Sequence, residues 1–158
     1  MLRIPALTAA LFIAGQAVAQ PVAASTIPAE VVAVAKAAQP TMTIVEAELK
    51  ERDGRRYYDV EGTLPGGAEI ELDLLQTSQG WEVVETQRDI AWIDAPALVQ
   101  AAAAASTKGV APVRVIESKQ NDGMIIYELF APGQPKTPAV EISWRDGVAK
   151  VLTETWPH

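Results

Sequence analysis

The chain has 158 residues, no cysteine and one histidine, and its 20 acidic and 13 basic residues give a net charge of −7. Without cysteine, disulfides, thiolate metal sites and a cysteine nucleophile are excluded, and the single His158 argues against a Ser-His-Asp triad or a multi-histidine metal site. The negative charge argues against a nucleic-acid partner, because phosphate binding depends on clustered Lys and Arg. The length suits one domain or two small ones.

The first 19 residues have the three parts of a secretory signal peptide. Arg3 supplies the positive start, residues 6–15 form a short apolar core, and residues 17–19 read Ala-Val-Ala, a small-x-small cleavage motif. The apolar stretch is shorter than the roughly 20 residues that a transmembrane helix needs. We therefore predict cleavage before Gln20 and a periplasmic mature protein without a membrane span.

The next part of the chain predicts one helix followed by strands. Residues 20–26 are small and are expected to form a flexible lead-in. Pro28 then opens a pattern with apolar residues at helical spacing, which ends at Pro40. Alternating apolar and polar residues predict four strands, with Asp53-Gly54 as a hairpin turn between the first two. These strands are expected at 42–51, 55–63, 69–74 and 81–87.

The same order of signals recurs about 70 residues later. A helix is predicted from Pro96 to Gly109, and further strands are expected near 112–119, 127–129 and 140–142. We therefore predict an α+β fold of two tandem repeats, residues 27–93 and 94–158, in which helices pack on one face of antiparallel sheet. Two interpretations stay open, one continuous sheet or two sheets in tight contact.

These motifs, in this order and in tandem, resemble the PepSY-like family, including its branch likened to β-lactamase inhibitory proteins. The resemblance implies an exported αβββ-type tandem fold with a binding or inhibitory role, and it brings no catalytic residues. Gln79 and Asp146 are departures, because the commoner pattern has threonine directly before each last-hairpin glycine. The motifs that carry the resemblance are Ile27-Pro28, Val45-Glu46, Asp53-Gly54, Tyr58-Asp59-Val60, Ile70-Glu71-Leu72-Asp73 and Trp81-Glu82-Val83, with their second copies Ile116-Glu117, Asp122-Gly123, Tyr127-Glu128-Leu129, Val140-Glu141-Ile142 and Asp146-Gly147.

The candidate binding residues are mainly acids of the first repeat. Residues 27–93 contain 13 acidic and six basic residues, whereas residues 94–158 contain seven and six. Strand alternation predicts that the acids share the solvent face of the first sheet, as a platform for a basic partner surface or simply as a solubilising face. Exposed aromatic residues would add apolar anchors to such a platform. The candidates are Glu46, Glu48, Tyr57, Asp59, Glu61, Glu69, Glu71, Asp73 and Trp81.

We therefore expect a non-catalytic binding protein that acts on another exported protein, such as a peptidase or other cell-envelope enzyme. The alternative is a small-ligand or divalent-cation-binding accessory protein of an envelope sensory system. No EF-hand loop is present, and we predict no cofactor and no dedicated metal site. A hydrolase with paired carboxylates is a third interpretation, which would require an enclosed pocket around those acids.

Overall fold

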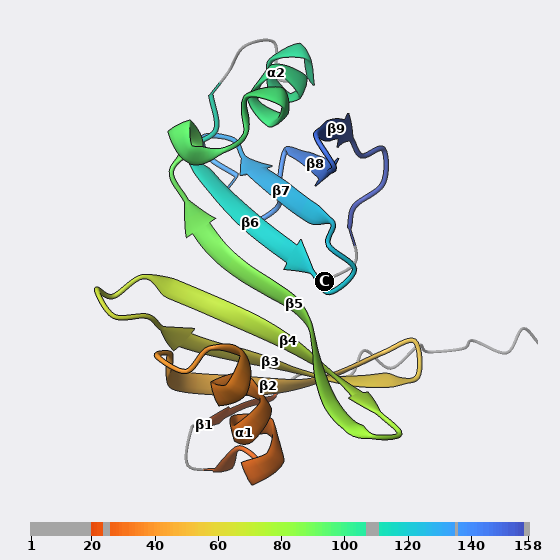
Figure 1. Cartoon of the computed structure of the whole chain (residues 1–158). Helices are drawn as coiled ribbons and strands as arrows, with labels where there is room; N and C mark the ends of the chain where they lie inside the picture. Colours follow the sequence, from red (N-terminus) through yellow and green to blue (C-terminus); the bar gives the residue numbers. More distant parts are fainter. Residues whose placement is uncertain (1–19, 24–25, 107–110, 135, 157–158) are drawn as a thin grey trace, which may run out of the picture.

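The computed structural model describes residues 20–23, 26–106, 111–134 and 136–156 (Figure 1). The predicted signal peptide, residues 1–19, lies outside the described residues. The fold is α+β, with nine antiparallel strands that follow one another in chain order across a single sheet. The elements are β1 (Gln20–Ala23), α1 (Ala29–Ala38), β2 (Thr43–Arg52), β3 (Arg55–Thr63), β4 (Glu69–Thr77), β5 (Gly80–Ile90), the 3₁₀ helix η2 (Trp92–Asp94), α2 (Ala97–Ser106), β6 (Arg114–Gln120), β7 (Ile125–Phe130), β8 (Val140–Arg145) and β9 (Val148–Val151).

Residues 20–23 form a strand, where a flexible lead-in was expected. They make up β1, which pairs antiparallel with β2 from Gln20 opposite Leu49 to Ala23 opposite Glu46. The residues of this segment have no strand pattern of their own. The pairing with β2 therefore explains why a strand is observed where a flexible lead-in was expected. β1 also covers the edge that β2 would otherwise expose.

The predicted hairpin turn at Asp53-Gly54 is confirmed. Both residues have positive φ, 53° and 71°, as a two-residue turn between right-twisted strands requires. Asp146 and Gly147 repeat this geometry between β8 and β9, with φ values of 51° and 79°. Asp in the first position of both turns is consistent with its tolerance of the left-handed region.

The first core lies between α1 and the sheet. Val31 and Ala35 of α1 are fully buried in one cluster with residues of β2, β3 and β4, among them Val60 and Leu72. Gly62 allows the segment after α1 to pack closely, because a Cβ there would lie 2.4 Å from the carbonyl oxygen of Thr43. The full buried set is Ile27, Val31, Ala35, Met42, Ala47, Tyr58, Val60, Ile70, Leu72 and Leu74.

A second core lies between α2 and the last four strands. Val99 and Ala103 of α2 are buried with Val115, Tyr127, Leu129 and Ile142. Trp92 of η2 and Trp144 of β8 pack against this cluster and are partly buried.

The two parts of the sheet are continuous through β5. This strand pairs with β4 on one side and with β6 on the other, and residues 85 and 87 have partners on both sides. Figure 1 shows β5 running from the part of the sheet beside α1 to the part below α2. The question of one sheet or two is thereby answered in favour of one. No helix in the described ranges is long and apolar enough to cross a membrane.

Candidate functional site

Two rows of acidic side chains cross the first part of the sheet. Directly opposed residues of antiparallel strands share a face, so the pairing register defines the rows. Like charges directly opposite each other are destabilising unless they are neutralised, which makes these rows unusual. The first row is Glu48, Asp59, Asp73 and Glu85, and the second is Glu46, Glu61 and Glu71, continued by Gln87.

A β-bulge brings β5 into these rows. The register shifts between Asp73 and Leu74, so that Leu74 faces Val83 while Asp73 faces Glu85, and Val84 is left over. Without the extra residue, Glu85 and Gln87 would lie on the same side as Val83, which packs against the first core. No local sequence pattern indicates this bulge, so Glu85, Gln87 and Asp89 were missed as residues of the acidic face.

The prediction that all of these acids lie in solvent is wrong for Asp59 and Asp73. Their exposed fractions are only 5% and 2%, whereas Glu46, Glu61 and Glu69 are exposed and Glu48 and Glu71 are partly buried. The alternation of apolar and polar residues predicts the side of the strand on which a side chain lies, but it does not predict how much of that side chain neighbouring residues shield from solvent. Asp59 and Asp73 occupy central strands, between the longer side chains of the same row, and are therefore covered.

Lys50 of β2 contacts the acidic rows. Its ammonium group forms an ion pair with Asp59 and lies 3.6 Å from a carboxylate oxygen of Glu48. Burial opposes the charge of Lys50, but its hydrogen bond and charge interaction with Asp59 outweigh burial, so the pKa of Lys50 is raised. Burial also raises the pKa of Asp59, although Lys50 acts in the opposite direction.

Glu71 and Asp73 have the most strongly shifted pKa values on this face. Burial and the nearby charge of Asp59 raise the pKa of Glu71 to about 7. Burial, Asp59 and Glu85 together raise the pKa of Asp73 to about 8. One carboxylate oxygen from each of Asp59, Glu71 and Asp73 lies within 4.8 Å of the other two. Near neutral pH this cluster therefore holds protons that ordinary carboxyl groups would have lost.

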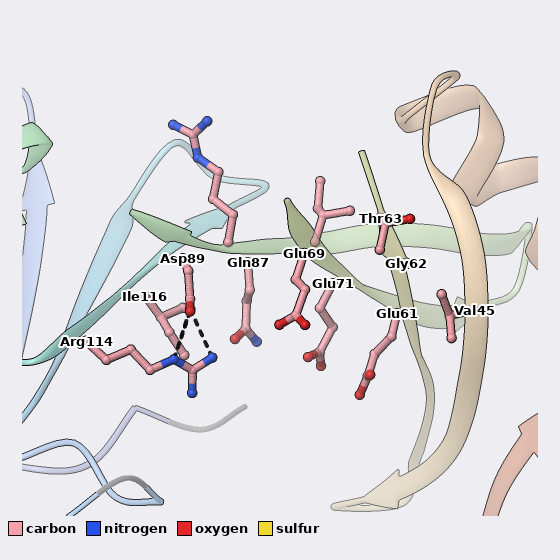
Figure 2. Close-up of a pocket in the computed structure, with 12 residues that line it drawn as sticks. Val45, Glu61, Gly62, Thr63, Glu69, Glu71, Gln87, Asp89, Arg114 and Ile116 are labelled. Atoms are coloured by element: carbon pink, nitrogen blue, oxygen red, sulfur yellow. Dashed lines mark hydrogen bonds and ion pairs between the residues drawn. The ribbon is translucent and has the colours of Figure 1, made fainter. Parts of the chain in front are cut away.

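A groove of about 270 Å³ lies beside the acidic rows, between β2 and β6. Figure 2 shows Glu61, Glu69 and Glu71 projecting in the same direction as Gln87. At the far end Arg114 of β6 is held by Asp89, with nitrogen–oxygen distances of 2.9–3.1 Å. Arg88 also lines the groove, but it is paired with Glu117. Because these two arginines are each paired with an acid, the charge left in the groove comes from the glutamates.

The two aromatic candidates lie in different places. Tyr57 is partly buried on β3, and the guanidinium carbon of Arg52 lies 4.5 Å from its ring centre. Trp81 packs edge-to-face on Tyr58, with ring centres 5.0 Å apart, and belongs to the periphery of the first core. The structure thus brings the acidic candidates together on one face and places Trp81 with the core.

Comparisons with protein-family models, with curated proteins and with solved structures gave no match to this chain. The function proposed below therefore relies on the residues, the geometry of the acidic face and the resemblance of the sequence motifs.

Proposed function

We propose that the protein is an exported, periplasmic and non-catalytic binding protein of PepSY-like type. Its acidic face would receive a basic segment of another exported protein, and the resemblance favours a peptidase or other cell-envelope enzyme that is inhibited or regulated by this contact. The single observation that carries the proposal is the open groove lined by Glu61, Glu69 and Glu71.

The architecture supports a duplicated unit with both helices on the opposite face from this groove. Each of α1 and α2 is followed by four strands in the same order. Leu72 of the first core is paired with Thr86, which is paired in turn with Lys119. Lys119 lies four residues from Val115 of the second core and so shares its side of β6. This register supports an arrangement in which α1 and α2 cover one face of the sheet and leave the acidic face uncovered.

The charge of the groove supports a cationic ligand. In the part of the chain that the structure describes, neither Glu61 nor Glu69 forms an ion pair. Burial and the neighbouring Glu46 raise the pKa of Glu61, which is the effect of negative charge without compensation. A partner that supplies positive charge would relieve this repulsion, and charge complementarity would also speed association.

The apolar residues of the groove narrow the ligand chemistry further. Val45, which is 55% exposed, and Ile116 line the groove together with the glutamates. Lys and Arg side chains combine an aliphatic stem with a charged end, so they match such a mixed surface. We therefore expect an extended or loop segment of the partner that carries several Lys or Arg residues.

Binding fits this geometry better than hydrolysis. The glutamates Glu61, Glu69 and Glu71 come from the adjacent strands β3 and β4, whereas the acid at the other end, Asp89, is held by Arg114. A glycosidase-like pair needs two available carboxyl groups on opposite sides of the substrate. An open groove with its available acids on neighbouring strands is suited to holding a cationic segment.

The test is partner capture with a charge-reversed groove. The double variant E61K/E69K should lose at least tenfold in affinity for the partner, which is first captured from periplasmic extract and then purified. The matched control E30K/D94K makes the same change of charge at exposed positions in α1 and η2, away from the groove, and should bind like the wild type. Equal binding by E61K/E69K and the wild type would exclude the acidic groove as the binding surface.

A further inference from the structure

The floor of the acidic face brings three carboxyl groups together from two adjacent strands. Asp59 of β3 is directly paired with Asp73 of β4, and Glu71 lies two residues away on β4, on the same face. One oxygen from each lies within 4.8 Å of the others. Both strands have a paired neighbour on each side, so the sheet fixes the backbone positions from which these three side chains extend.

One oxygen atom of Asp73 is buried without a hydrogen-bond partner. Among the residues that the structure describes, none donates a hydrogen bond to its Oδ1 atom, and the whole residue is 2% exposed. Buried carboxylate oxygens normally accept hydrogen bonds or bind cations, because their loss of hydration is otherwise uncompensated. Asp73 also has the acids Asp59 and Glu85 directly opposite it on the two neighbouring strands. The carboxyl group of Asp73, which contributes one oxygen to the cluster and has a buried oxygen without a partner, is therefore positioned for a cation that enters the cluster.

Lys50 neutralises only part of the cluster. Its ammonium group contacts Asp59 and approaches Glu48. Its side chain is 40% exposed, so it can move away from Asp59 while it remains near Glu48. One ammonium group beside Asp59, Glu71 and Asp73 leaves an excess of negative charge when all three are ionised.

We propose that Asp59, Glu71 and Asp73 form a binding site for a calcium ion. The donors are all carboxylate oxygens, which favour hard cations such as Ca²⁺ and Mg²⁺ over softer metals. Ca²⁺ binds oxygen at about 2.3–2.6 Å, so any two of its ligands lie at most about 5.2 Å apart, and the three oxygens, which all lie within 4.8 Å of one another, meet this condition. Ca²⁺ also accepts irregular ligand geometry, whereas Mg²⁺ demands near-ideal octahedral geometry and retains its water, so a cluster of carboxylates on two paired strands suits Ca²⁺ better.

This proposal departs from the sequence-based prediction of no dedicated metal site. That prediction followed from the lack of an EF-hand loop, in which one continuous segment supplies the ligands. Here paired strands would supply them, through the register of β3 against β4. The raised pKa values of Glu71 and Asp73 add that Ca²⁺ binding at neutral pH would release protons.

The site does not depend on the proposed partner. The groove test changes the exposed Glu61 and Glu69, whereas the calcium site uses the buried or partly buried residues of the cluster. The variant D73N should therefore lose calcium and keep the partner, and E61K/E69K should lose the partner and keep measurable calcium binding. Failure of one proposal is thus distinguishable from failure of the other.

The experiment is isothermal titration of the chelator-treated mature protein with CaCl₂, and separately with MgCl₂. We expect one Ca²⁺ per chain, with a dissociation constant of about 10⁻⁵–10⁻³ M and weaker binding of Mg²⁺. The variants D73N and E71Q should each weaken Ca²⁺ binding at least tenfold. The control E46Q removes an exposed acid from the same face and should stay within about twofold of the wild type.

A fourth variant tests the role of Lys50. K50M removes the competing ammonium group and should bind Ca²⁺ several-fold more tightly than the wild type. If D73N does not fold, E71Q and K50M still decide the question, because Glu71 is partly exposed and Lys50 lies at the edge of the cluster. Absence of saturable Ca²⁺ binding below about 5 mM, or equal affinity in E71Q, E46Q and the wild type, would overturn the proposal.

Discussion

Asp73 on β4 and Glu117 on β6 are buried acids of the same sheet, but their surroundings differ. Glu117 accepts a 2.8 Å hydrogen bond from Nε of Arg88 and forms a second ion pair, of 3.3 Å, with Lys119. Burial would raise the pKa of Glu117, but these two basic partners outweigh burial and lower it. Asp73 has acidic neighbours instead, and its pKa is raised to about 8.

This difference distinguishes acids whose charge is already balanced within the fold, such as Glu117, from acids whose charge is available for binding, such as Asp73. A carboxylate whose basic partners come from the same chain is satisfied when the protein folds. A carboxylate surrounded by other acids becomes satisfied only by a proton or by a cation from outside the chain. The uncompensated acids lie on the face that carries the groove, which is why we propose this face as the binding surface.

The largest expected effect concerns the pH dependence of stability. The folded-state pKa values of Glu71 and Asp73, about 7 and about 8, lie above the ordinary values of 4.5 and 3.8. The folded protein therefore binds more protons than the unfolded chain between these limits, so stability should fall as pH rises from about 4 to 8. Urea unfolding without metal ions should give a free energy of unfolding several kcal/mol lower at pH 8.5 than at pH 5.

The variant D73N provides the control for this pH dependence. An asparagine has no charge to bury, so D73N should be more stable than the wild type at pH 8.5 and should lose much of the dependence on pH. E46Q, which changes an exposed acid of the same face, should retain the wild-type dependence. A wild-type protein whose stability rises steadily from pH 5 to 8.5 would contradict the assignment of raised pKa values.

A smaller effect on stability is expected at Glu117, whose charge is balanced by two basic residues. The variant R88M should destabilise the protein by about 1 kcal/mol at pH 7, because Glu117 stays buried and keeps only Lys119 as a basic partner. Since the pKa of Glu117 is lowered in the folded state, this contribution is present above about pH 4.5 and is lost as the pH falls below that value.

A control for R88M is available at the surface. Arg145 and Asp122 form an exposed ion pair, so R145M should leave the thermal midpoint unchanged. If R88M and R145M behave alike, the contact between Arg88 and Glu117 does not stabilise the fold, and the contrast with Asp73 is weakened.

Much of the fold could be predicted because its signals are local. The hairpin at Asp53-Gly54 depends on two residues that tolerate positive φ, and the strands around it depend on alternation. The helix predicted from Pro96 to Gly109 is observed at Ala97–Ser106, where the structure describes it. β1 could not be predicted in this way, because its main support is the neighbouring strand β2.

The candidate site was predicted in part. Alternation correctly placed Glu46, Asp59 and Glu71 on one side of the sheet. It did not show that Asp59 and Asp73 are covered, since coverage depends on residues from neighbouring strands. It also missed Glu85 and Arg114, because the bulge at Val84 and the pairing of β5 with β6 involve residues far apart in the sequence.

Carbon-13 NMR titration of the individual carboxyl groups in the metal-free protein tests the central claim most directly. The account predicts that Asp73 and Glu71 titrate near pH 8 and pH 7, while Glu117 titrates below its ordinary value of 4.5. Titration of Asp73 and Glu71 below pH 5 would contradict the claim. Such low pKa values would mean that other groups of the chain already stabilise these carboxylates, as Arg88 and Lys119 stabilise Glu117, so that a cation or a basic partner would compensate nothing.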